Sequence, residues 1–366
     1  MNILIIIVTT FLITYKAFSS VGFEDGVISE FAVSGRSLAM GNAFIAKVDD
    51  SSSVFYNPAG LGTVRGVRFH LSNFHVETNR GWMGATSGGS VTDVPANFPK
   101  GFSLDGNREI LLANRDKFAF SKFSLMPNLT FRNFSIGYLF SRQTRATISS
   151  AGSELFEYAV RQDMGPYCAL NLPLFGGILK FGATAIWLTR KEDFGDVDKD
   201  TTIDLQDGDY NEGTSWQIIS GFKFTVPIYS LPTIALKMNN SASTSFGAAS
   251  GSAGAPIKIK QSVDAGISIT PQIGKVMRIH LEFNYKDVTK NYDMSALRRA
   301  TLGIEFDVKR TFFLRFGYGD GFGSAGLGIN TKKLQFDFTT YAVDTTSTDF
   351  RGSEDRRFAL TVSSGF

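Results

Sequence analysis

The chain has 366 residues, a mean hydropathy of −0.01 and a net charge of only +3 at pH 7. This small charge argues against a nucleic-acid partner, and the single cysteine, Cys168, excludes an intramolecular disulfide. The composition is unusual for its 34 phenylalanines and 37 glycines. A soluble protein has difficulty burying so many aromatic rings.

The first 19 residues are typical of a secretory signal peptide. The apolar run from Ile3 to Tyr15 is shorter than the ~20 residues that a membrane-spanning helix needs. Small residues, Ala17 and Ser19, follow it at positions suitable for cleavage. We therefore expect residues 1–19 to be removed after export.

A compact module rich in small residues follows, from residue 20 to residue 62. It contains the sequences SGRSLAMGNA (Ser34 to Ala43) and SVFYNPAGLG (Ser53 to Gly62). Glycines permit close backbone approach, and Pro58 after Asn57 indicates a turn. The aromatic residues of the module need a concave apolar surface to cover them.

From about residue 63 to residue 366 the chain alternates between apolar and polar residues, as a strand with two different faces does. In residues 276–286, for example, Ile279, Leu281 and Phe283 alternate with charged or polar residues. Fourteen such segments are predicted: 65–77, 118–131, 133–146, 155–173, 177–190, 213–226, 232–239, 257–270, 275–287, 297–308, 311–318, 323–330, 333–342 and 356–366.

Two folds fit this alternation, a soluble β-sandwich with apolar residues inside and a membrane β-barrel with apolar residues outside. The segments are long for a sandwich, their number is even, and short turns alternate with longer polar loops. The chain also ends in an apolar face of Phe358, Leu360, Val362 and Phe366, which resembles the insertion signal of bacterial outer-membrane barrels. We therefore predict an all-β, 14-stranded antiparallel barrel, with short turns in the periplasm, long loops outside and residues 20–62 as a plug in its lumen. The longest loop, residues 79–117, is expected to be an irregular surface segment.

The module at residues 20–62 also resembles the N-terminal hatch of the FadL/TodX family of outer-membrane transport proteins. The resemblance rests on SGRSLAMGNA, the following Asp49-Asp50 pair and the aromatic-Asn-Pro-Ala-Gly sequence. It implies a plugged barrel for passive uptake of hydrophobic small molecules, typically long-chain fatty acids. The matching hatch residues are Gly35, Arg36, Gly41, Asn42, Asp49, Asp50, Asn57, Pro58, Ala59 and Gly60.

The chain is shorter than typical fatty-acid transporters and lacks their extended loops. In this it is similar to the PorV-like branch, whose members act in protein secretion and surface attachment. Two functions therefore remain open, a hatch-gated uptake channel and a structural barrel that binds exported proteins. A non-specific polar pore is disfavoured because the hatch should block the lumen. The expected partners are outer-membrane lipid, the barrel-assembly machinery and a hydrophobic ligand or an exported protein.

The polar face of the segments should line the lumen. Its charged residues are balanced in sign, which indicates a salt-bridged inner wall or a surface that selects a charged head group. They are Lys258, Lys260, Asp264, Arg278, Glu282, Lys286, Glu305, Asp307, Arg315 and Asp337.

Other candidate sites are weaker. Asp196, Asp198, Asp200 and Asp204 have the spacing of part of a calcium loop, but Thr201 replaces the turn glycine and Asp207 replaces the bidentate glutamate. A solvated acidic loop is the favoured alternative. His70 and His75 are expected on opposite faces of one strand, so no histidine metal site is predicted. We predict no enzymatic activity and no required cofactor.

Overall fold

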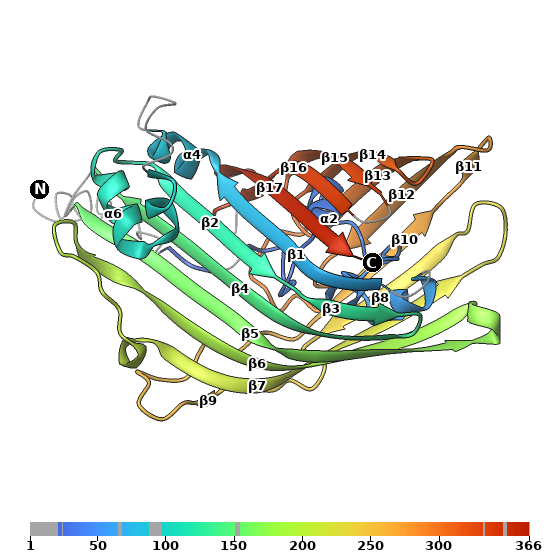
Figure 1. The fold of residues 1–366 in the computed structure, drawn as a ribbon, viewed down its shortest axis with the longest axis horizontal. Helices are drawn as coiled ribbons and strands as arrows, with labels where there is room; N and C mark the ends of the chain where they lie inside the picture. The colour runs from blue at the N-terminus through green and yellow to red at the C-terminus, as the bar shows by residue number, and fades with distance from the viewer. Residues whose placement is uncertain are drawn as a thin grey trace, which may run out of the picture.

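The alternating segments form one antiparallel sheet that closes on itself by pairing β1 with β17 (Figure 1). The computed structural model describes residues 21–23, 25–64, 68–87, 97–150, 154–331, 334–346 and 350–365. The predicted signal peptide, residues 1–19, and Phe366 lie outside these residues. Within the described ranges the sheet is a closed 14-stranded barrel, as predicted.

The 14 barrel strands correspond to more than 14 separate segments, because some strands are interrupted. Proline 127 cannot donate a ladder hydrogen bond, so the predicted strand 118–131 is split into β2 and β3. Similarly, β10 and β11 together form one strand of the barrel. β9 is a two-residue strand within a loop. The strands are β1 (Arg68–Asn79), β2 (Phe118–Leu125), β3 (Asn128–Phe131), β4 (Phe134–Ile148), β5 (Leu155–Leu174), β6 (Leu179–Asp198), β7 (Asn211–Thr225), β8 (Thr233–Asn239), β9 (Gly247–Ala248), β10 (Ser262–Ile269), β11 (Gln272–Ile273), β12 (Met277–Tyr285), β13 (Ala300–Val308), β14 (Phe312–Gly319), β15 (Phe322–Asn330), β16 (Leu334–Asp344) and β17 (Glu354–Gly365).

The outer face of the barrel is apolar and exposed. Trp187 and Trp216 pair across β6 and β7, with ring centroids 4.9 Å apart. A closed barrel with an apolar outer belt that includes aromatic residues is the arrangement of a bacterial outer-membrane protein. Further exposed outer-face residues are Leu170, Phe181, Ile234, Ile267, Leu302, Phe316, Leu327 and Phe338.

Among the described helices, none is long and apolar enough to cross a membrane.

The two ends of the barrel differ, since short turns lie at one end and long loops at the other (Figure 1). Short turns mark the periplasmic side of such barrels. The prediction that every short turn is periplasmic is wrong in one place. β14 and β15 are joined at Asp320-Gly321, at the end that carries the long loops. A positive φ at both residues allows this tight connection.

The predicted irregular segment at residues 79–117 contains helices. They are α4 (Arg80–Thr86), η2 (Lys100–Phe102) and α6 (Leu104–Leu112). The Asn79 side chain caps α4, and the Ser103 side chain caps α6. Trp82 and Leu111 pack against Ala146 and Ile148 on the outer face of β4. The loop therefore folds down over the outside of the strand ends rather than extending into solvent.

His70 and His75 do not lie on opposite faces of β1. The register of β1 against β17 shifts between His70 and Ser72, so one extra residue enters the strand. As a result both histidines are buried, with Nδ1 of His70 2.7 Å from Ser363 Oγ and Nδ1 of His75 2.7 Å from Thr361 Oγ1.

Candidate functional site: the hatch and the lumen

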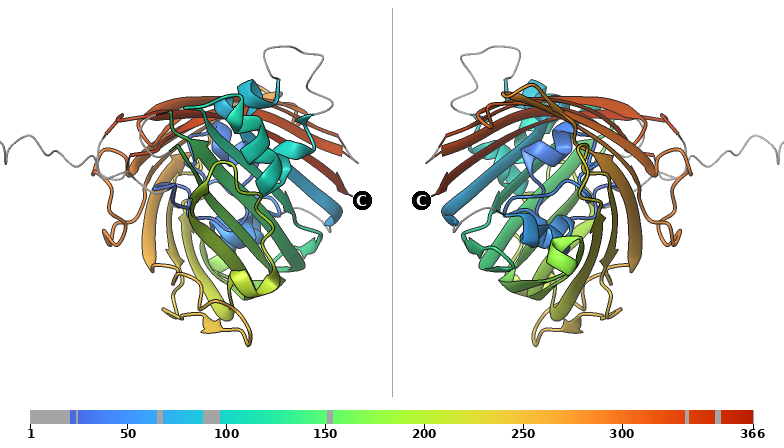
Figure 2. Two further views of the ribbon diagram at one scale, coloured as in Figure 1. Left: turned by 90° about the vertical axis from the view of Figure 1, so that its left-hand side faces the viewer. Right: turned by 90° about the vertical axis from the view of Figure 1, so that its right-hand side faces the viewer.

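Residues 20–62, called the hatch, lie in their described part within the ring of strands (Figure 2). Three short helical segments shape this region: α2 (Gly35–Ala39), α3 (Ser53–Tyr56) and η1 (Pro58–Thr63). Ser34 caps α2, and Asn57 caps η1 by accepting from the Ala59 amide, with Pro58 at the first position of η1. The two sequence motifs therefore encode capped turns.

The hatch has a small core of its own. Met40, Phe44, Val48 and Tyr56 are completely buried and pack together. The Ser37 hydroxyl donates to the Tyr56 hydroxyl at 2.5 Å, which satisfies the polar tip of this ring. The module therefore holds its shape through contacts between residues that lie within 20 positions of one another in the sequence.

One side of the hatch makes an apolar contact with the wall formed by β4 to β7. Val54, Phe55 and Leu61 pack against inward-facing side chains of these strands. Phe55 meets Tyr167 edge to face, with ring centroids 5.2 Å apart. The wall residues in this cluster include Leu139, Tyr167, Ala169, Ile186, Leu188 and Ile219. The inner wall is thus not polar throughout.

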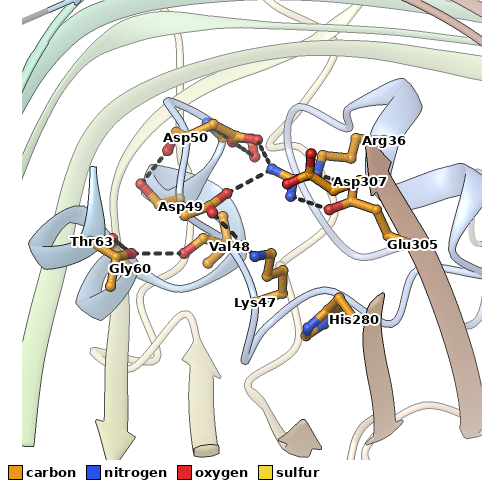
Figure 3. A network of polar contacts seen from close by, with 12 residues as sticks. Arg36, Lys47, Val48, Asp49, Asp50, Gly60, Thr63, His280, Glu305 and Asp307 are labelled. Carbon is orange, nitrogen blue, oxygen red and sulfur yellow. Dashed lines mark hydrogen bonds and ion pairs between the residues drawn. The ribbon is translucent and has the colours of Figure 1, made fainter. Parts of the chain in front are cut away.

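The other side of the hatch is held by charge, and Arg36 is central to it (Figure 3). The guanidinium donates twice to the Glu305 carboxylate on β13, at 2.7 Å each, and also to Asp49 at 2.7 Å and Asp50 at 2.9 Å. Burial alone would raise the pKa of the Asp49 carboxyl, but the charges of Lys47 and Arg36 outweigh it and hold this pKa well below its usual value. Arg36 therefore joins the Asp49-Asp50 turn to the barrel wall.

A second carboxylate of the wall, Glu282 on β12, binds hatch backbone. It accepts from the amides of Ala46 at 2.7 Å and Lys47 at 2.8 Å. Asn57 contacts the wall in the opposite direction, from a hatch side chain to wall backbone. Its side-chain amide donates to Ile45 O within the hatch at 3.0 Å and to two wall carbonyls at 3.3 Å. The Asn of the Asn-Pro-Ala motif thus attaches the hatch to β7 and β8.

The residues before α2 are held by two further acidic residues that sequence reasoning did not identify. Glu30 is buried and accepts from Lys237 at 2.9 Å and from Lys286 at 3.1 Å. Burial would raise the pKa of Glu30, but these two ammonium groups hold it below its usual value. The alternation of β8 could have placed Lys237 on the inner face, but no local pattern connects it to Glu30.

Asp25 makes the second such contact. Its carboxylate accepts from Arg145 at 2.7 Å and from Arg357 at 2.7 and 3.0 Å. Burial would raise the pKa of Asp25, but the Arg145 and Arg357 charges keep it below its usual value. Strands β4 and β17, on either side of β1 and β2, are thereby tied to the start of the hatch.

The hatch backbone also touches the wall directly at glycines. A Cβ on Gly317 would lie 2.1 Å from the Gly41 nitrogen, and a Cβ on Gly303 would lie 2.8 Å from Met40 Cβ. Gly41 itself has a φ of +63°, which favours glycine. Gly60 instead approaches Val48 of the hatch, so its role is internal to the module.

A cavity of about 600 Å³ opens at the end of the barrel that carries the long loops. Its lining combines apolar side chains with arginines and carboxylates: Val21, Phe23, Phe118, Phe194, Ile257, Met294, Arg145, Arg161, Asp25, Asp293, Glu354 and Asp355 are among them. A smaller cavity of about 110 Å³ shares Phe23, Asp25 and Arg161 with it. The Phe23 ring lies under the Arg161 guanidinium, 4.0 Å from it, and meets Phe194 edge to face. The start of the hatch therefore stands between the two cavities.

Most of the predicted lumen residues lie on the inner wall. Glu305, Arg315 and Asp337 form a buried chain of ion pairs, since Arg315 donates to Glu305 at 2.8 Å and to Asp337 at 2.5 Å. Arg278 pairs with Asp307, and Lys286 lies 3.6 Å from Asp264.

The lumen-wall assignment of Lys258 and Lys260 stays a prediction, since both line the smaller cavity but neither lies on a strand of the wall. Both are exposed and precede β10, which begins at Ser262. Ile259 between them packs against the buried cluster around Phe55. Lys258 donates to Ser243 Oγ at 3.2 Å, and Lys260 lies over the Tyr292 ring.

The four aspartates considered as calcium ligands are exposed and spread along the chain. Asp196 and Asp198 belong to the extended strand β6, which continues further than predicted, while Asp200 and Asp204 follow it. Across the described part of the chain, no three His, Cys, Asp or Glu residues converge on a point that could hold a metal ion. This geometry gives the calcium alternative no support.

The proposed insertion signal lies on β17. Phe358, Leu360 and Val362 alternate with the buried Ala359, Thr361 and Ser363, so they occupy the lipid-facing side. Their recognition by an assembly machinery stays a prediction.

No protein-family model matches this sequence, and no curated protein matches it. Solved structures do. The chain is similar in fold to the CymD monoaromatic hydrocarbon channel, with a TM-score of 0.53 and 11% identity over 93% of this chain and 98% of that one. It is also similar to the toluene transporter TodX of P. putida, with a TM-score of 0.52 and 11% identity over 92% of this chain and 99% of that one. The resemblance of the hatch motif to the FadL/TodX family is thus confirmed at the level of the fold.

Proposed function

We propose that this protein mediates passive uptake of hydrophobic small molecules across the outer membrane. The observation that carries the proposal is the cavity at the outer mouth of a barrel whose lumen the hatch fills, because three phenylalanines line it together with charged side chains. The similarity in fold to CymD and TodX, which are named as hydrocarbon and toluene channels, supports it. Uptake in this scheme needs no energy source, because the molecule moves down its own gradient.

The substrate we favour is an elongated hydrophobic molecule with one polar end, such as a long-chain fatty acid. The cavity volume of about 600 Å³ falls within the ~300–1,000 Å³ typical of small-molecule sites. Phe23, Phe118 and Phe194 would contact the apolar part, and the carboxylate would approach Arg161, whose guanidinium also pairs with Glu192 at 2.8 Å. This choice goes beyond what the related channels are named for.

The hatch acts as the gate in this proposal. It fills the lumen, and ion pairs hold the side that faces β8, β12 and β13, while apolar packing holds the side that faces β4 to β7. Ion pairs can exchange partners or water without exposing apolar surface. We therefore expect the hatch to loosen first on its charged side.

Uptake of a radiolabelled long-chain fatty acid by cells expressing the protein tests the proposal. Phe194→Gln removes an aromatic wall of the mouth cavity and should lower the initial rate several-fold. Phe350→Gln is the matched control, because Phe350 is exposed in an outer loop and does not line this cavity. Equal rates in the two variants and the wild type, at equal amounts of folded barrel, would contradict the proposal.

The secretion-associated alternative stays a prediction. It requires a deletion strain that loses an exported protein from its surface while its uptake of hydrophobic compounds is unchanged. The opposite result, unchanged secretion with reduced uptake, supports the channel.

A further inference from the structure

The lipid-facing surface has a groove that the uptake pathway does not explain. It crosses β8, β10, β12, β13 and β14 and has a volume of about 710 Å³. Its lining is almost entirely apolar and includes Ile234, Ile267, Leu281, Phe283, Ile304 and Phe316. This volume lies within the ~300–1,000 Å³ that is usual for small-molecule sites, so the groove is large enough to hold a hydrophobic chain.

The groove lies over a part of the wall that contacts the hatch. Gly303 and Gly317 line the groove, and on their inner side they touch Met40 and Gly41 of the hatch. A third glycine of this wall, Gly266, would place a Cβ 2.8 Å from the Ile45 side chain. Without inner side chains, these strands lie directly on the hatch.

The position of the groove on the apolar belt favours a bilayer lipid as its occupant. The groove is continuous with the exposed apolar belt, so hydrocarbon rather than water faces it. It extends to Val226 and Pro232, at the short turn between β7 and β8. This turn belongs to the periplasmic end, so the groove opens towards the periplasmic leaflet.

Basic residues lie in the periplasmic turns next to β12 and β13, two of the strands that the groove crosses. Lys275 is exposed in the turn before β12, and Lys309 and Arg310 are exposed in the turn after β13. The two turns touch, since the Lys309 amide donates to Val276 O at 2.8 Å. Lys309 and Arg310 have φ values of +54° and +55°, positions for which Asn-Gly is the favoured sequence. The backbone conformation alone therefore does not explain why two basic residues occur at this turn.

We propose that this surface binds one phospholipid of the periplasmic leaflet. One acyl chain fills the groove, and the phosphate contacts Lys275 and Lys309. The inference rests on the outer-membrane location and the wall geometry, and it does not depend on which molecule the lumen carries.

Native mass spectrometry of the full-length protein, loaded with phosphatidylglycerol and transferred to a mild detergent, tests the site. The wild type should retain one lipid per chain. Ile304→Trp fills the groove and should reduce the retained fraction at least tenfold, whereas Leu327→Trp, on the same apolar belt but outside the groove, should leave it unchanged. No lipid on the wild type, or equal retention in both variants, would overturn the proposal.

The head-group contact is tested separately. Lys275→Gln combined with Lys309→Gln should lower phosphatidylglycerol retention several-fold, while Lys290→Gln, an exposed lysine of an outer loop, should have no effect. A phospholipid with a photoactivatable diazirine in its acyl chain tests the site on the wild-type protein. Covalent labelling is expected on peptides of β12 and β13. Labelling spread evenly around the belt, or retention of a non-lipid compound in the groove, would exclude a phospholipid site.

Discussion

Arg36 concentrates more hatch contacts than any neighbouring side chain of the same motif. Its guanidinium joins three carboxylates, of which Glu305 belongs to the wall and Asp49 and Asp50 belong to the hatch. The ring of Phe44 lies 4.9 Å away on its face. Its removal would leave the Glu305 carboxylate, which is 1% exposed, with Arg315 as its remaining hydrogen-bonded cation among the described residues.

Arg36→Gln should therefore lower the free energy of unfolding by about 3–5 kcal/mol, the usual cost of breaking a buried pair. Arg115→Gln is the control, because the Arg115–Glu154 pair is on the surface and should be worth about 0–1 kcal/mol. Denaturant unfolding in lipid vesicles measures both. Similar losses in the two variants would show that the hatch contacts of Arg36 contribute little.

A pH prediction also belongs to single residues. The pKa of Glu30 is depressed in the folded protein, so its stabilising contribution is fully present above the unfolded value of about 4.3 and is lost only as the pH falls through the lower folded value. Protease protection of the hatch should therefore be the same at pH 7 and pH 5. Glu30→Gln should reduce protection at both. A loss of protection in the wild type between these pH values would contradict the assignment.

At the scale of elements, the hatch is positioned by glycines on facing segments. Gly41 in the hatch and Gly317 on β14 are in backbone contact, and neither has room for a methyl group. Ion pairs from neighbouring strands, such as that between Arg36 and Glu305 on β13, stabilise this backbone contact. The contact is a surface match between two elements, so it depends on residues far apart in sequence.

Gly317→Ala should displace the hatch at a cost of roughly 1–3 kcal/mol, as overpacked contacts do. Gly323→Ala on the next strand is the matched control, because a Cβ there would meet no atom within 4 Å. Planar-bilayer conductance should rise for Gly317→Ala and not for Gly323→Ala. Closed channels in both variants would show that the hatch tolerates the displacement.

The elements themselves were largely predictable, because alternation is a local property. Segment 155–173 was predicted and β5 runs over Leu155–Leu174. The differences arose where another contact decided the outcome. Ile259 turned inward to reach the cluster around Phe55, and the bulge after His70 placed both histidines inside. The long loop was expected to be irregular, because the surface of β4 that Trp82 and Leu111 cover is not specified by any local pattern.

The candidate site was predictable only in part for the same reason. The hatch motifs identified Arg36 and Asn57, yet their wall partners are set by the three-dimensional register of the barrel. Glu30 and Lys286 are separated by 256 residues, and no spacing rule relates them. The cavity at the mouth likewise forms from the hatch, several strands and outer loops together.

At the scale of the whole molecule, alternate residues along each strand face two environments, the lipid outside the barrel and the hatch inside it. Phe338 on β16 is 48% exposed and faces lipid, whereas Asp337 and Thr339 beside it are buried inside. The same parity holds along β12, where Leu281 and Phe283 are exposed and Glu282 is buried. The outer surface therefore matches a bilayer, and the inner surface matches the hatch.

Phe338→Arg should lower the free energy of unfolding by about 2–4 kcal/mol if it lies near the bilayer midplane. Gln143→Arg, on the inner side at the smaller cavity, should cost much less. Urea unfolding in lipid vesicles compares the two. Equal destabilisation by the two arginines would mean that the face assignment is wrong.

The long separation between hatch and wall contacts has a consequence for biosynthesis. The Gly35 amide donates to Thr361 on β17 across 326 residues, and Arg36 reaches Glu305 across 269. The hatch is made early, but its partners are among the last strands to leave the ribosome and the export channel. Contacts between residues so far apart in the sequence form slowly, and until they form Val54, Phe55 and Leu61 lack the wall residues that cover them. We therefore expect the apolar face of the hatch to stay exposed in the newly exported chain until β17 pairs with β1 and completes the wall.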